Sequence, residues 1–170
     1  MSSLVIVTIE AALREPANRV SPRAVPFWRL SAALGAVVIW VAVAVTFVFW
    51  RDQPWWATAA LVLLVFWPLA YVVVMPSLRF RIHRWEVTET AVFTRSGWLS
   101  RDQRIAPLSR VQTVDSHQGA LMRLFGLSSI TVTTASAAGP IRIDCLDQQV
   151  ARGVVAELTR ITGSSEGDAT

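Results

Sequence analysis

Two uncharged stretches decide the fold of this chain: LSAALGAVVIWVAVAVTFVFW at residues 30–50 and WWATAALVLLVFWPLAYVVVMPSL at residues 55–78. A helix needs about 20 apolar residues to cross the hydrocarbon core of a bilayer, and each stretch meets that length. Only the residues RDQP at 51–54 connect the two stretches, so two spanning helices must return side by side and antiparallel. The sequence therefore predicts a transmembrane α-hairpin.

The rest of the chain has the composition of one small domain. The hydrophobic fraction of the whole chain is 53% and its mean hydropathy is +0.44, but the polarity is ordinary once the hairpin is left out. We expect an N-terminal arm over 1–29, the hairpin over 30–78, one folded domain over 79–163 and a flexible tail over 164–170. The single cysteine, Cys145, cannot form a disulfide within the chain, which favours a reducing, cytoplasmic location for the domain.

The charge distribution favours a membrane surface over nucleic acid. All 16 basic residues are arginine, and the net charge is +4. Beyond residue 79, arginines and carboxylates nearly balance, whereas a nucleic-acid-binding module has a dominant basic face. Arginines flank both ends of the hairpin, while Arg51 alone lies in its loop. The positive-inside rule therefore predicts that both termini are cytoplasmic.

The first residues do not have the pattern of a cleaved signal peptide, because no positive charge opens the chain and Glu10 interrupts the apolar run. Two alternatives remain open for this arm: a disordered segment or a short segment at the membrane interface. Pro16, Pro22 and Pro26 predict an extended backbone over residues 15–27.

After residue 78 the pattern changes to the alternation typical of antiparallel strands. The predicted strands cover residues 80–87, 91–96, 98–105, 111–117, 130–134 and 141–145. The first turns are expected at residues 88–90 and 96–97.

Two helices are predicted among and after these strands. The segment GALMRLF at 119–125 has helical spacing, with Gly126 as its C-terminal cap. A longer helix is expected over 148–162, with Asp147 as N-cap and Gly163 at its end. One face of that helix should be buried, because it carries an apolar stripe of Val150, Val154, Leu158 and Ile161.

Four motifs in order carry a resemblance to a known family: WEVT at 85–88, RSGWLSR at 95–101, IAPLSRVQ at 105–112, and QGALMRLFGL at 118–127 followed by ITV at 130–132. With the preceding hairpin, they resemble the YdbS-like family of membrane-anchored bacterial PH-like proteins. The resemblance implies a PH-like domain with two roughly orthogonal antiparallel β-sheets, a short inserted helix and a C-terminal capping helix. It implies no catalytic motif, cofactor or defined ligand. It also suggests a paralogous PH-like membrane protein as a partner, and it leaves out the residues before Val20.

No catalytic or metal centre is predicted. Asp115, Ser116 and His117 are residue types found in catalytic triads, but neighbouring side chains on a strand point to opposite faces, so Ser116 cannot meet both. The sequence contains no G-x-S-x-G, glycine-rich phosphate loop, HExxH or CxxC motif. His83 and His117 have no cysteine or histidine at ligand spacing.

The candidate binding residues follow the second stretch. They are six arginines near the membrane or near the turn at residues 96–97, namely Arg79, Arg81, Arg84, Arg95, Arg101 and Arg104. Two roles remain open: they only enforce topology, or they hold the domain on anionic lipid head groups, where each contributes about 1 kcal/mol. Trp98 and Leu99, beside the turn, are either an exposed partner surface or part of the core.

A second set of candidate residues lies in the motifs that most resemble the YdbS-like family. Arg110, Gln112 and Arg123 are interpreted as structural residues whose hydrogen bonds tie residues 105–112 to the short helix.

These expectations favour a non-enzymatic, membrane-anchored adaptor or scaffold in the bacterial plasma membrane. Its cytoplasmic PH-like domain would bind another protein or anionic lipid. The alternative is an accessory subunit of a membrane export or envelope-stress complex, with the hairpin as the interface. No cofactor, metal or nucleic-acid partner is expected.

Overall fold

A computed structural model describes residues 15–50, 52–135 and 139–167 of the chain. The chain divides into two compact units. One unit is the hairpin, Val25–Leu78, and the other is a domain built from the chain on both sides of that hairpin.

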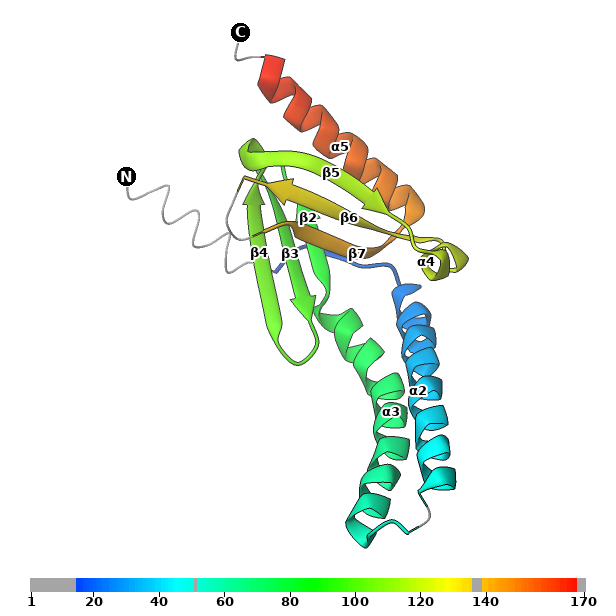
Figure 1. Cartoon of the computed structure of the whole chain (residues 1–170). Helices are drawn as coiled ribbons and strands as arrows, with labels where there is room; N and C mark the ends of the chain where they lie inside the picture. The colour runs from blue at the N-terminus through cyan, green and yellow to red at the C-terminus, as the bar shows by residue number, and fades with distance from the viewer. Residues whose placement is uncertain (1–14, 51, 136–138, 168–170) are drawn as a thin grey trace, which may run out of the picture. The chain divides into compact units, whose positions relative to one another are not determined.

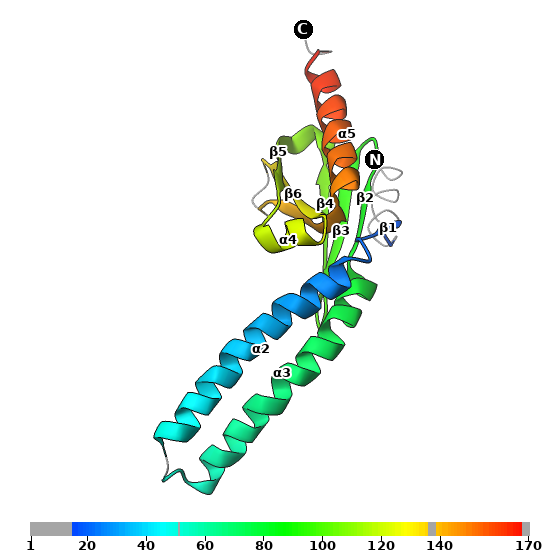
Figure 2. The ribbon, with the colours of Figure 1, turned by 90° about the vertical axis from the view of Figure 1, so that its right-hand side faces the viewer.

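The hairpin consists of helices α2 (Ala24–Phe49) and α3 (Trp55–Ile82), which run side by side and antiparallel (Figures 1 and 2). Both are long and apolar enough to cross a membrane, and only 6% and 11% of their most apolar segments are buried. A core helix of a soluble protein would have most of these side chains covered. The indole Nε1 of Trp40 in α2 donates a hydrogen bond to the carbonyl oxygen of Val65 in α3 at 3.1 Å. The predicted hairpin is confirmed.

The helix ends differ from the prediction. α2 begins at Ala24, so the extended backbone expected up to residue 27 ends earlier; Pro26 is tolerated because N–H groups in a first turn have no partner within the helix. α3 continues to Ile82, so the strand expected from residue 80 was wrong there. Nothing after Pro76 interrupts the backbone hydrogen bonds, and the N–H of His83 still donates to the carbonyl of Arg79 at 2.9 Å.

The first sheet of the domain has the strand order β1-β2-β3-β4. These strands are β1 (Asn18–Arg19), β2 (Arg84–Val87), β3 (Ala91–Gly97) and β4 (Arg101–Pro107). Side chains alternate between its two faces. The inner face carries the buried side chains of Trp85, Val92, Thr94 and Ala106. The outer face carries the side chains of Arg84, Arg95, Gln103 and Arg101, by the register of the strands.

The arm before α2 is part of this sheet, which the sequence did not predict. β1 pairs antiparallel with β2, with Asn18 opposite Trp85. The indole N–H of Trp85 donates a hydrogen bond to the carbonyl oxygen of Arg19 at 3.2 Å. The backbone N–H of Ser21 donates to the carbonyl oxygen of Cys145 at 3.0 Å. Residues 15–23 are therefore ordered rather than disordered, a location at the membrane interface stays a prediction, and residues 1–14 lie outside the described part. Because segments before and after the hairpin share one sheet, both must lie on the same side of the membrane.

The second sheet has the order β5-β6-β7 and crosses the first at a steep angle (Figure 1). Its strands are β5 (Val111–His117), β6 (Leu127–Thr134) and β7 (Ile141–Asp147). The short 3₁₀ helix η1 (Leu108–Arg110) connects the two sheets, and helix α4 (Ala120–Leu124) connects β5 to β6. Gly126 follows α4 with φ 65°, the left-handed conformation of a C-terminal cap, as predicted. The register of β6 and β7 shifts beside Cys145, which is buried and has φ 57°.

Helix α5 (Gln148–Gly167) runs along the second sheet (Figure 1). Its buried positions are Ala151, Val154 and Leu158, while Val150 of the predicted stripe is exposed. Gly163 does not end the helix, because an isolated glycine weakens a helix by about 1 kcal/mol without removing a hydrogen bond. The carboxylate of Asp147, the predicted N-cap, accepts a hydrogen bond from Ser21 Oγ at 2.9 Å. With two antiparallel sheets and a closing helix, the PH-like fold is confirmed.

Candidate functional site

The turn between β3 and β4 projects two large apolar side chains. The strands pair up to Gly97 opposite Arg101, so residues 98–100 form the turn and the strand predicted from residue 98 starts three positions later. Leu99 is 86% exposed and Trp98 is 38% exposed. Leu99 therefore lies outside the core, whereas Trp98 is partly covered, and a partner surface formed by this pair stays a prediction.

Three of the six candidate arginines share the outer face of the first sheet. Arg84 and Arg95 are directly opposite each other on β2 and β3. Arg101 pairs with Gly97, two residues from Arg95, and so lies on the same face. The side chains of Arg84 and Arg95 are only 22% and 15% exposed. Two like charges directly opposite each other repel, so this pair requires a neighbouring anion.

That anion is the carboxylate of Glu15. Its Oε1 accepts a hydrogen bond from Arg95 Nη1 at 2.5 Å, and its Oε2 lies 3.7 Å from Arg84 Nε. The hydrogen bond from Arg95 lowers the pKa of Glu15, and the charges of Arg95, Arg84 and Arg101 lower it further. The N–H of Ala17 donates to Glu86 Oε2 at 3.0 Å, which fixes the backbone next to Glu15. Sequence reasoning missed Glu15, because no local pattern links residues 80 positions apart.

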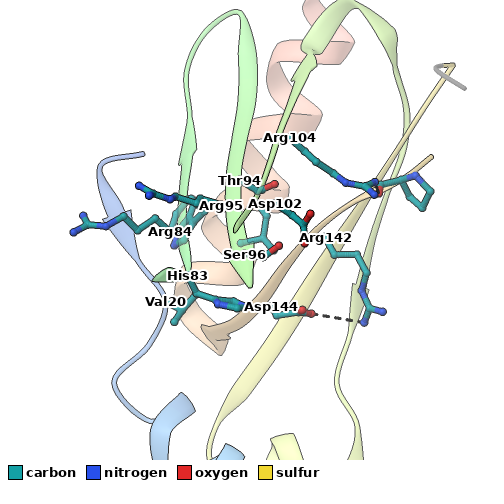
Figure 3. Close-up of a pocket in the computed structure, with 13 residues that line it drawn as sticks. Val20, His83, Arg84, Thr94, Arg95, Ser96, Asp102, Arg104, Arg142 and Asp144 are labelled. Carbon is teal, nitrogen blue, oxygen red and sulfur yellow. Dashed lines mark hydrogen bonds and ion pairs between the residues drawn. The ribbon is translucent and has the colours of Figure 1, made fainter. Parts of the chain in front are cut away.

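The other three arginines lie elsewhere. Arg104 is on the inner face of β4, and its Nη1 donates to the carbonyl oxygen of Pro140 at 3.1 Å. Figure 3 shows the side chains of Arg84 and Arg95 extending to one side of the first sheet, and that of Arg104 to the other. Arg79 and Arg81 lie in the last turn of α3. The structure therefore divides the predicted basic cluster into an outer-face triplet, Arg84–Arg95–Arg101, and three separate cations.

A cleft of about 260 Å³ lies between the inner face of the first sheet and β7 (Figure 3). His83, Thr94, Ser96, Asp102 and Asp144 line it with polar groups. Its charges are partly paired within the cleft, because a carboxylate oxygen of Asp144 lies 3.7 Å from Arg142 Nη2.

His83 is buried in the wall of this cleft. Arg79 Nε donates to His83 Nε2 at 3.3 Å, and His83 Nδ1 lies 3.0 Å from the carbonyl oxygen of Arg79. Because arginine only donates, Nε2 must accept, and the ring proton must be on Nδ1. Burial lowers the pKa of His83, and the positive charge of Arg79 lowers it further. The imidazole is therefore neutral.

The described residues assemble no triad from Asp115, Ser116 and His117, which are exposed along β5. Asp115 accepts a hydrogen bond from Thr113 Oγ1 at 3.3 Å, two residues away on the same face, while Ser116 points to the opposite face. Within the described ranges, no group of three or more His, Cys, Asp or Glu side chains is placed to hold a metal ion.

The three residues predicted to tie residues 105–112 to the short helix lie at the surface. Arg110, Gln112 and Arg123 are exposed, on η1, β5 and α4 respectively. Next to α4, the amide of Gln118 donates to the carbonyl oxygen of Leu127 at 2.8 Å, which joins the end of β5 to the start of β6.

Acidification is expected to destabilise the domain through His83. Its pKa is below the ordinary value of about 6.5 in the folded state, so the unfolded chain takes up the proton first. The free energy of unfolding should therefore be constant above about pH 7 and fall as the pH drops below about 6.5. Thermal unfolding of the purified protein between pH 7.5 and 5.5 measures this slope. His83→Gln should remove most of the pH dependence of stability, whereas His117→Gln, at an exposed site, should leave that dependence unchanged. An equal slope in the wild type and His83→Gln would contradict this assignment.

Comparison with known proteins agrees with the architecture. The family model described as "Bacterial PH domain" matches residues 5–161, which includes arm residues that the sequence resemblance left out. The chain is 31% identical over 157 residues to the UPF0699 transmembrane protein YdbS of Bacillus subtilis (strain 168), covering 87% of this chain and 96% of that protein. No solved structure matches the chain. A membrane hairpin joined to two crossed sheets and a closing helix, together with these matches, shows that the chain belongs to the YdbS-like family of bacterial PH domain proteins.

Proposed function

We propose that this protein is a non-enzymatic adaptor, anchored by α2 and α3 in the bacterial plasma membrane with both termini in the cytoplasm. In this proposal, the PH-like domain binds anionic lipid head groups through the β3–β4 hairpin. The observation that carries the proposal is the turn itself, where Leu99 is 86% exposed next to Trp98 and the exposed Arg101.

The chemistry of this turn matches a bilayer surface. Tryptophan favours the interface between head groups and acyl chains, and a leucine side chain gains free energy when it leaves water. Each arginine near an anionic surface contributes about 1 kcal/mol. Together, the apolar pair and the arginine are sufficient for a measurable vesicle affinity, and helices α2 and α3 add a high effective concentration when the lipid is in the same membrane.

The adaptor role follows from what this attachment leaves available. With the β3–β4 hairpin on the membrane, the exposed residues of β5 and α5 remain for a protein partner, for which a paralogous PH-like membrane protein is a candidate.

The test uses the full chain, because cutting at residue 79 would remove β1. Protein held in phosphatidylcholine nanodiscs is mixed with vesicles of phosphatidylcholine alone or with 30% phosphatidylglycerol, and bound protein is recovered by vesicle flotation. We expect binding to the anionic vesicles only. Leu99→Ser and Arg101→Gln should each weaken binding about fivefold, which corresponds to about 1 kcal/mol.

The matched control is Arg160→Gln, which removes one exposed arginine from α5. Its vesicle affinity should equal that of the wild type. Equal binding to neutral and anionic vesicles would refute the lipid-binding role, as would equal losses from Arg101→Gln and Arg160→Gln.

A further inference from the structure

The outer face of the first sheet holds an anion in the structure, and that anion belongs to the chain itself. The Glu15 carboxylate is hydrogen-bonded to Arg95 and ion-paired with Arg84, so these two guanidinium groups already have a geometry that binds an oxyanion. The arginine side chains are largely covered, whereas that of Glu15 is 60% exposed. The cations are thus fixed in the sheet, and their anion lies on the solvent side.

Carboxylates do not balance the charge of this face. Three guanidinium groups, on Arg84, Arg95 and Arg101, lower the pKa of Glu15. By the register of the strands, Arg19 and Glu86 lie on the same face, so four arginines share it with two carboxylates. A phosphate monoester carries a charge of about −1.5 to −2 near pH 7 and has three acceptor oxygens. Such a group would neutralise the three arginines more completely than a carboxylate does, and arginine forks bind phosphate and carboxylate in the same bidentate manner.

The triplet is next to the turn that is proposed to meet the membrane. Arg95 is two residues from Gly97, about 7 Å along the strand, and Arg101 opens β4 directly opposite Gly97. A lipid whose head group contacts the turn at Leu99 therefore places its phosphate within reach of Arg101 and Arg95.

We propose that Arg84, Arg95 and Arg101 form a binding site for the phosphate group of an anionic lipid, and that Glu15 occupies this site until the phosphate displaces it. This inference rests on the proposed lipid-binding function and adds to it a defined site and an internal competitor. Displacement of Glu15 releases residue 15, three positions before β1, from Arg84 and Arg95.

The test measures competition at one site with a double-mutant cycle. Full-length protein in phosphatidylcholine nanodiscs is titrated with vesicles containing 30% phosphatidic acid, for the wild type, Glu15→Gln, Arg95→Gln and the double variant. Glu15→Gln removes the competitor and should raise vesicle affinity about two- to fivefold, the range expected for an exposed ion pair. Arg95→Gln should lower the affinity about fivefold. In the Arg95→Gln background, Glu15→Gln should have a smaller effect than in the wild type, because only the longer 3.7 Å ion pair with Arg84 remains.

Glu157→Gln is the matched control for Glu15→Gln. It also removes one exposed carboxylate that is paired with an arginine, Arg160, and whose pKa that arginine lowers. It changes the net charge equally, so it should leave vesicle affinity unchanged. Equal gains from Glu15→Gln and Glu157→Gln would mean that only net charge matters, and would overturn the site.

Further outcomes separate the inference from the function on which it rests. If Leu99→Ser weakens binding but Glu15→Gln has no effect, the lipid-binding turn stands and the phosphate site is refuted. If no variant binds anionic vesicles, both are refuted. Inorganic phosphate and glycerol 3-phosphate test whether the bound phosphate group belongs to a lipid or to a soluble molecule. Both should compete with vesicles only at millimolar concentration. Micromolar binding of inorganic phosphate by Glu15→Gln would show that the ligand is a soluble phosphate and not a lipid.

Discussion

Gly97→Ala is expected to disrupt the β3–β4 hairpin and to abolish the vesicle binding proposed for it. Gly97 has φ 123°, a conformation that L-residues rarely adopt. An added Cβ would lie 1.9 Å from the carbonyl oxygen of Ser100 and 2.9 Å from its carbonyl carbon. These are backbone atoms on the far side of the turn, so the hairpin must change shape. Backbone strain alone costs about 1–3 kcal/mol, and the clash adds to it.

Thermal unfolding and vesicle flotation of the full-length variant measure the two effects. The control is Gly153→Ala in α5, where no atom other than those of the adjoining residues and of the helix's own backbone lies within 4 Å of the added Cβ. Alanine there should stabilise the helix by up to about 1 kcal/mol and should leave vesicle binding unchanged. A Gly97→Ala protein with wild-type stability and vesicle affinity would show that the turn does not need glycine.

Ile130→Ala is expected to lower the free energy of unfolding by about 2–5 kcal/mol, the range for removing most of a buried aliphatic side chain. Ile130 is 0% exposed in the middle of β6, between β5 and β7. With neighbours on both strands and α5 against the same sheet, the space left by the side chain cannot collapse easily. The loss is large relative to the total stability of a domain of this size.

Chemical denaturation of the full-length protein, followed by circular dichroism at a strand-sensitive wavelength, measures the change. Ile105→Ala is the matched control, because Ile105 is a strand isoleucine that is 39% exposed on the outer face of β4. Ile105→Ala should lower the free energy of unfolding by less than half as much as Ile130→Ala does. Similar losses from the two variants would contradict the burial of Ile130 in the core of the domain.

The arginines and the apolar pair of the candidate site could be found from the sequence, but Glu15 and the grouping of the arginines could not. Arginines near the turn and near the membrane stand out in a linear reading, as do Trp98 and Leu99. Which arginines share a face depends on strand register, and a shift of one residue reverses every side chain. Because β4 starts at Arg101 rather than at residue 98, Arg101 falls on the outer face with Arg95, and Arg104 falls on the inner face.

By itself the sequence determined the features that depend on local composition and period. Length and lack of charge specify the two membrane helices, alternation specifies most strands, and Gly126 specifies the end of α4. Only the tertiary structure decided the role of the arm, in which Glu15 and β1 join a sheet whose other strands follow the hairpin. A two-residue strand has no period of its own, and a carboxylate has no local sign of a partner 80 residues away. Long-range pairing of this kind is fixed by the register and burial of the finished domain.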